Sequence, residues 1–265
     1  ALLNANDVSY NEVPAVAATT RRTLGRIPAL KDTYKDGDVL IINVETGSDF
    51  VDWCSSMLTF KTTTDATAVM QSTDSTILDC FREVVVYSRN GTELLRQQFF
   101  NLYSRSDLIV RHSKDWLETV GSSFGYGDNT TDHAAGVTWS VPMRVFSDLM
   151  CKNQKSPPQL VSGMRIEIVL ESAQKSFVWQ DEDSHSYNLT EIVLLADTHT
   201  LTDAISRKIM SDSAQNGLVQ QWTDYSHISQ DVGAASTRAT VNFQKSVARA
   251  SRALVLVRSA VNIDL

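Results

Sequence analysis

Apolar and polar residues alternate along several short segments of this chain, and that pattern constrains the fold more than any other feature. In residues 164–171, apolar side chains take every second position, at Met164, Ile166, Ile168 and Leu170. Most of the positions between and after them are charged. A repeat of two residues is typical of a β-strand with one buried and one exposed face. Residues 55–62 and 136–145 alternate in the same way. Half-buried strands are therefore predicted to dominate the fold.

Composition supports a folded protein rich in strands and turns. Of the 265 residues, 42% are hydrophobic and 21% are charged, a balance that excludes a disordered chain and a collagen-like fibre. Serine and threonine number 29 and 24, a fifth of the chain, and such residues favour strands and turns over helices. The length predicts one large domain, or one domain and part of another.

The order of elements predicts an antiparallel sandwich. Further strands are expected at 39–44, 81–88, 177–179, 187–196, 218–228, 239–245 and 253–257. Asn90-Gly91 is a strong hairpin signal, but apolar residues then recur at helical spacing, so a helix is predicted over 93–108. Further helices are expected at 114–120 and from Thr200 or Thr202 to Asn216. Residues 1–36 are predicted to be an extended arm or surface loop, and 62–76 and 121–136 are predicted loops.

Charge and targeting signals limit the partners. No apolar run approaches the length of a membrane span, and no signal peptide is visible. A net charge of −7 disfavours a general nucleic-acid binder. Arg21, Arg22 and Arg26 nevertheless cluster, and they are either a short arm that contacts nucleic acid or membrane phosphates, or a solvated basic turn. The three cysteines form no metal or disulfide pattern and are expected to be reduced thiols, mostly buried.

No motif nominates a catalytic, cofactor-binding or metal-binding residue, so none is predicted. The five histidines lack metal-ligand spacing, and no nucleophile elbow, phosphate loop or dinucleotide fingerprint is present. Residues 124–128 are glycine-rich but open no helix, which favours a flexible loop. Residues 181–183 are three consecutive acids that suit calcium, although such a run is usually just solvated.

Several blocks resemble the double jelly-roll major capsid proteins of adenovirus-like, virophage-like and tailless-phage-like viruses. Residues 34–60 are similar to the opening strands of that family, and residues 81–95 to its strand, glycine turn and following helix. Val141-Pro142-Met143 and residues 160–168 resemble later strands, and residues 187–197 the last strand of the first roll. The likeness covers residues 34–258 as a pattern, without a single diagnostic motif.

The resemblance implies an all-β antiparallel jelly-roll sandwich with one or two inserted helices and a partial second roll or C-terminal extension. It divides the chain into an arm (1–33), a first roll (34–198), and a connector helix with strands of an incomplete roll or extension (199–265). It implies a structural protein, not an enzyme, without cofactor or small-molecule substrate. The protein would self-assemble into an icosahedral shell as trimers or pseudo-hexameric capsomers, together with other capsid proteins. It would be made in the host cytoplasm or nucleus and reside in the virion, with Arg21, Arg22 and Arg26 touching the genome or an internal membrane.

Three alternatives stay open. A single-roll capsid protein of a small RNA or DNA virus would fit a chain that is long for one roll and short for two. A carbohydrate-binding sandwich would use the five tryptophans as stacking platforms: Trp53, Trp116, Trp139, Trp179 and Trp222. A hydrolase on the same scaffold would need a carboxylate pair that spacing alone does not reveal. If the protein is a capsid protein, residues 93–108 and 121–136 are the predicted subunit contacts. Residues 1–30 are then expected to face the shell interior or a neighbouring subunit.

Overall fold

A computed structural model describes residues 19–72, 74–150, 155–180 and 185–216. By its internal contacts the chain divides into residues 1–225 and residues 226–265. All structural statements below concern the first of these units. The predicted strands 218–228, 239–245 and 253–257, the acidic run 181–183, Cys151 and Trp222 lie outside the described residues.

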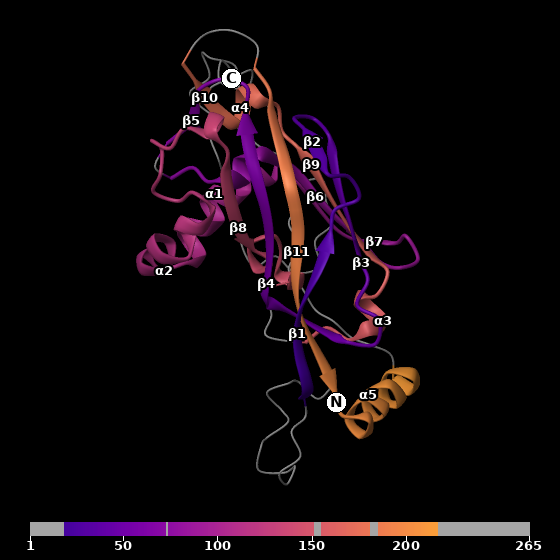
Figure 1. The fold of residues 1–265 in the computed structure, drawn as a ribbon. Helices are drawn as coiled ribbons and strands as arrows, with labels where there is room; N and C mark the ends of the chain where they lie inside the picture. Colours follow the sequence, from indigo (N-terminus) through magenta and orange to yellow (C-terminus); the bar gives the residue numbers. More distant parts are fainter. Residues whose placement is uncertain (1–18, 73, 151–154, 181–184, 217–265) are drawn as a thin grey trace, which may run out of the picture. The chain divides into compact units, whose positions relative to one another are not determined.

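A five-stranded and a four-stranded antiparallel sheet carry the fold (Figure 1). The first has the order β1 (Thr19–Pro28), β11 (Tyr187–Leu201), β4 (Phe50–Thr64) and β8 (Val137–Pro142), with the short β2 (Thr33–Lys35) also paired to β11. The second has the order β3 (Val39–Val44), β9 (Met164–Leu170), β6 (Phe81–Tyr87) and β7 (Glu93–Gln98). A separate pair joins β5 (Ala68–Met70) to β10 (Phe177–Trp179).

The pairing of the eight long strands identifies the fold as a jelly roll. The first of these strands pairs with the last (β1 with β11), the second with the seventh (β3 with β9), the third with the sixth (β4 with β8), and the fourth with the fifth (β6 with β7). A hairpin whose two arms roll up together gives this nested order and places alternate pairs in opposite sheets. The predicted all-β jelly-roll sandwich is thus confirmed.

The core lies between the inner faces of the two sheets. Leu58 and Phe60 of β4 oppose Val141 and Trp139 of β8, and all four side chains are buried. From the second sheet, the buried positions of β9 are its alternate residues, as the period-two pattern predicted: Met164, Ile166, Ile168 and Leu170. These residues belong to one continuous apolar cluster, as sheet-on-sheet packing requires.

Four helices lie in connections between described strands: α1 (Phe100–Arg111), α2 (Lys114–Thr119), α3 (Pro158–Val161) and α4 (Ala173–Ser176). Helix α5 (Asp203–Asn216) follows β11. The predictions for α2 and α5 are confirmed. Ser113 caps α2 by accepting a hydrogen bond from the backbone amide of Trp116. Among the described residues, no helix is both long enough and apolar enough to cross a membrane.

The predicted N-terminal arm is wrong for residues 19–28, which form β1. This strand is the first of the roll, so the roll begins before the predicted boundary at residue 34. The error has a physical cause, because β1 is an edge strand whose residues are mostly exposed and its sequence therefore lacks alternation. The remaining domain boundaries stay predictions.

The predicted helix over 93–108 is wrong in its first third. Residues 93–98 form β7, which pairs with β6 through the Asn90-Gly91 hairpin, and α1 begins only at Phe100. Glutamate, leucine, arginine and glutamine are good helix formers, and pairing with β6 overrides that preference. Gly91 has a φ of 77°, the left-handed conformation that this turn requires.

The two predicted loops contain more structure than expected. Strand β4 continues to Thr64 and β5 follows at once, so residues 62–76 are only partly loop. Residues 121–136 hold two short 3₁₀ turns, Gly121–Phe124 and His133–Ala135. Both Phe124 and His133 are buried, which ties this segment to the core.

Candidate functional site

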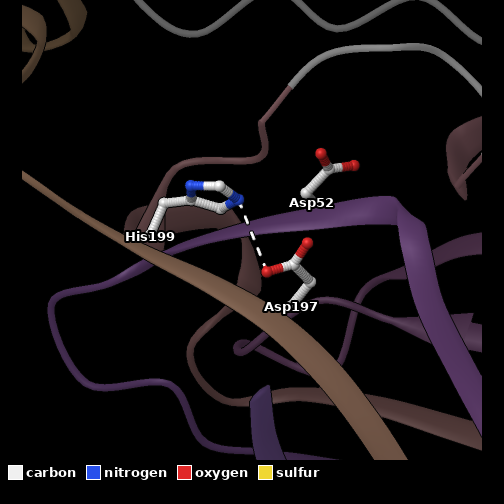
Figure 2. Close-up of side chains that lie close together, drawn as sticks. All are labelled: Asp52, Asp197 and His199. Atoms are coloured by element: carbon white, nitrogen blue, oxygen red, sulfur yellow. Dashed lines mark ion pairs between the residues drawn. The ribbon is translucent and has the colours of Figure 1, made fainter. Parts of the chain in front are cut away.

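A buried cluster of ionisable side chains lies at one end of the first sheet (Figure 2). It contains Asp52 of β4 and Asp197 and His199 of β11, with ligand-type atoms that all lie within 4.8 Å of one another. Asp197 and His199 are almost fully buried, at 3% and 6% exposure. Charged and titratable groups are rarely buried without partners, so the surroundings of this cluster decide its role.

Strand register brings the three residues together. Asp52 lies directly opposite Asp197 in the β4–β11 ladder, and His199 follows Asp197 by two positions on the same face of β11. Ser56 ties the two strands further, because its hydroxyl donates to the carbonyl of Asp52 and accepts from the backbone amide of Asp197. The carboxylate of Asp52 accepts a hydrogen bond from the Cys54 amide.

Arg22 of β1 binds the carboxylate of Asp197 through two nitrogens. Its Nε donates at 2.9 Å and 3.1 Å to the two oxygens, and one terminal nitrogen donates at 2.6 Å. Bidentate arginine–carboxylate pairs have strong directional preference. These bonds raise the pKa of Arg22 above its usual value, and they anchor the edge strand to β11.

Lys155 approaches His199 from a segment outside the sheet. Its Nζ lies 3.1 Å from Nδ1 of His199. An ammonium group can only donate, so Nδ1 accepts and the neutral ring carries its proton on Nε2. That Nε2 has no hydrogen-bond partner and lies 3.5 Å from Oδ1 of Asp197, the contact marked by the dashed line in Figure 2. This contact is an ion pair only when the ring is protonated.

The cluster shifts the titration of both buried groups. Burial alone would raise the pKa of Asp197, but the hydrogen bond from Arg22 and the nearby positive charges outweigh it and lower that pKa. For His199, burial and the positive charge of Lys155 lower the pKa, against a smaller opposite effect of Asp197. At neutral pH the cluster therefore holds an ionised Asp197 beside a neutral His199.

The donor set fits an ion-pair network better than a metal centre. Two carboxylates and an imidazole are suitable ligands for a divalent cation. Here, however, Arg22 binds both oxygens of Asp197 and Lys155 binds the imidazole, so two fixed positive charges already balance the two carboxylates. A cation would have to compete with both. The arrangement instead fastens β1, β4, β11 and the segment around Lys155 to one another.

The three arginines predicted to contact the genome or a membrane have different environments. Arg22 is engaged by Asp197, and Arg21 pairs with Asp49 at 3.8 Å with its side chain largely exposed. Arg26 lies on the exposed side of β1. Two of the three thus have carboxylate partners within the chain, which weakens the attraction of this segment for phosphates. The contact itself stays a prediction.

The described tryptophans are engaged in the fold. Trp53 and Trp139 are buried. Trp116 stacks on His112 with ring centroids 3.7 Å apart, while the guanidinium of Arg144 lies 4.9 Å from the Trp116 ring centre. Burial and the neighbouring arginines lower the pKa of His112 to about 4. Trp179 stacks on His185 at 4.5 Å. Burial or a stacked neighbour therefore covers at least one face of each of these four rings.

The predicted buried thiol is found at Cys80, where burial raises the pKa. Cys54 is only half-buried. The ionic cluster itself was missed at the sequence level, since its members lie far apart in the chain. The one local sign was Asp197-x-His199, two polar residues on one face at the end of an apolar strand.

In comparisons with known proteins, no family model and no curated protein matches this chain. One matching solved structure is VP54 of PBCV-1, fitted into a reconstruction of the virophage Sputnik, with 8% identity and a TM-score of 0.48. Another is the quasi-atomic model of the PBCV-1 virus capsid, with 9% identity and a TM-score of 0.46. Each match covers 76% of this chain and 47% of the other, so the chain spans about half the length of the structures it matches.

No argument is built on matches with identities and TM-scores this low. The strand order given above establishes the fold independently. The function proposed below therefore rests on the surfaces of the chain itself.

Proposed function

We propose that this chain is a structural subunit of a viral capsid and that it assembles with copies of itself. Three features support the proposal: the jelly-roll strand order, the exposed strand at the edge of the first sheet, and an apolar helix face. The apolar helix face is the main support for the proposal, because an apolar patch on a protein surface marks a contact with another molecule.

Helix α1 has apolar residues on two opposite sides. Phe100 and Leu108, on one side, are buried against the roll. On the other side Leu102, Ile109 and Val110 recur at the spacing i, i+7 and i+8, which aligns them on one face. Ile109 and Val110 are 50% and 59% exposed. A second packing partner would bury this face, and a neighbouring subunit is the partner that a shell supplies.

Strand β1 offers a second surface for assembly. It pairs with β11 on one side, and within the described residues its other side has no strand partner. Unpaired strand edges bind other strands readily, and symmetric assemblies cover them with neighbouring copies. Thr20, Arg21, Thr23 and Arg26 surround the exposed Leu24 with polar and charged side chains, which limits indiscriminate pairing of this edge before assembly.

The proposal is tested by replacing Ile109 and Val110 together with glutamine in the full-length protein. Both side chains are exposed, so the change should leave the melting temperature of the isolated subunit nearly unchanged. It should reduce or abolish assemblies seen by analytical ultracentrifugation and electron microscopy.

Val178→Gln is the matched control, since Val178 is similarly exposed at 47% on a different element. Assembly should survive this control. A wild-type protein that stays monomeric at high concentration would refute the proposal. If the double variant assembled as well as the control, α1 would not be a contact between subunits.

The finer features of the proposal follow from the family resemblance. They are a trimeric or pseudo-hexameric capsomer, an icosahedral shell, other capsid proteins as partners, location in the virion after synthesis in the host cytoplasm or nucleus, and the lack of enzymatic activity. The eight-strand roll between residues 19 and 201 supports one complete roll in this chain. Both the single-roll reading and the first half of a double roll are compatible with it.

A further inference from the structure

Lys155 and His199 link the ionic cluster to a chain segment that closes the end of β4. Ser156, next to Lys155, forms two backbone hydrogen bonds with Val51: the Ser156 amide donates at 2.8 Å and the Val51 amide at 3.0 Å. Val51 is adjacent to Asp52 of the cluster. The contact of Lys155 with His199 and the bridge between Ser156 and Val51 therefore hold the same segment in place.

We propose that His199 is a proton-operated clasp, which holds the segment beginning at Lys155 when neutral and releases it when protonated. The inference concerns this cluster alone and does not depend on the proposed capsid function.

The chemistry of the ring gives the direction of the switch. Neutral His199 accepts the hydrogen bond from Lys155 at Nδ1. The next proton can bind only at Nδ1, because Nε2 already carries one. Protonation therefore removes the acceptor and places an imidazolium against an ammonium group at a separation of 3.1 Å in the neutral state. Like charges this close repel, and the mobile partner is the lysine side chain.

The other charged groups around His199 act on the same equilibrium. Asp197 on β11 and Asp52 on β4 attract the imidazolium and keep the ring in place, whereas Arg22 on β1 opposes the added charge. Because Arg22 already binds Asp197, it offsets part of the attraction between the Asp197 carboxylate and the His199 imidazolium. Protonation would therefore displace Lys155 outward while His199 stays beside Asp197.

The sign of the pH effect follows from the lowered pKa of His199. The unfolded chain, with a histidine pKa of 6.5, binds the proton more readily than the folded cluster. The stabilising contribution of His199 is hence fully present above pH 6.5 and declines as the pH falls toward the lowered pKa of the folded state. The clasp closes at neutral pH and opens in mild acid.

Hydrogen exchange of the full-length protein tests the clasp through two backbone amides, those of Ser156 and Val51. Their protection factors, corrected for the intrinsic pH dependence of exchange, should fall at least severalfold between pH 7.5 and pH 5.0. Amides in the β3–β9 ladder, such as those of Ile42 and Ile166, should keep their protection and so report that the sheet stays folded. Unchanged protection of Ser156 and Val51 at pH 5.0 would overturn the proposal.

Two variants separate His199 from general acid effects. His199→Gln keeps an uncharged acceptor for Lys155 and cannot titrate, so the pH dependence at Ser156 should disappear, whereas His185→Gln should retain it. Lys155→Met removes the repelled charge and should also abolish the pH dependence. This variant provides the test if the His199 variant does not fold. A full acid response in either Lys155→Met or His199→Gln would contradict the clasp.

Discussion

Asp197 accepts hydrogen bonds from Arg22 through both carboxylate oxygens, although 175 positions separate the two residues in the chain. Its side chain is buried while that of Arg22 is largely exposed. This asymmetry makes the carboxylate the member whose loss matters, because removing it leaves Arg22 without its acceptor and removes the negative charge that faces His199.

Asp197→Asn is expected to lower the free energy of unfolding at pH 7 by about 1–3 kcal/mol, since a neutral buried amide cannot accept the Arg22 hydrogen bonds through both of its polar atoms. The folded pKa of Asp197 lies below its usual 3.8, so its stabilising contribution is present above pH 3.8 and is lost as the pH falls through the folded pKa. The difference between wild type and variant should therefore shrink in strong acid.

Urea unfolding at pH 7 and at pH 3 measures both effects. Asp203→Asn is the control, because Asp203 is exposed on α5 and its ion pair with Arg207 should contribute within about 0.5 kcal/mol. Equal stability of the Asp197 variant and wild type at pH 7 would contradict the proposed role of the pair.

At the scale of elements, the hairpin between β6 and β7 depends on a single glycine. Gly91 has a positive φ of 77°, with open space where a Cβ would lie. A side chain at this position would strain the backbone, although it would clash with no neighbouring atom. Gly91→Val is expected to lower the free energy of unfolding by about 1–2 kcal/mol, measured by chemical denaturation. Gly25→Ala, at a glycine whose φ is not positive, should change stability less, and the reverse order would count against this account.

Elements with a strong internal pattern were predictable from sequence, and elements shaped by their neighbours were not. In β9 the alternating apolar residues are the buried ones, so the predicted limits of the strand agree with the observed ones to within a residue. By contrast, β7 buries Leu95 and Gln97 on one side, and the buried glutamine hides the alternation that would have indicated a strand. The hairpin signal at Asn90-Gly91 was the better guide there, because turn chemistry is local.

At the scale of the whole molecule, the closure of the roll by β1 can be tested with two fragments. Residues 19–201 contain all eight strands, whereas residues 34–198 match the domain predicted from sequence and lack β1. Without β1, β11 loses a strand partner and Asp197 loses Arg22.

The fragment 19–201 is expected to unfold cooperatively on heating, as followed by circular dichroism. The fragment 34–198 should melt at a clearly lower temperature or fail to fold. The described part of α5 is mostly exposed, so the loss of this helix should cost the roll little. Equal melting temperatures for the two fragments would mean that β1 is dispensable and that the sequence-based boundary was adequate.

The strand order identifies the fold, but it was not predictable from the sequence. Antiparallel pairing between the first and last strands produces no local sequence pattern. The same is true of the ionic cluster, whose members meet only once β1, β4 and β11 are in register. Sequence patterns therefore predicted the class of fold and most of its strands, while the pairing of distant strands determined the site.

The pairing of the first strand with the last also sets the timing of folding. During synthesis β1 emerges early, yet its partner β11 is not complete until residue 201 has been added. At roughly 5–20 residues per second, the ribosome would keep β1 waiting for about ten to forty seconds. Such long-range pairing is intrinsically slow to form. A nascent chain would thus hold β1 without its partner while the other strands of the roll are made, and the arginines of β1 would keep the unpaired strand soluble during that time.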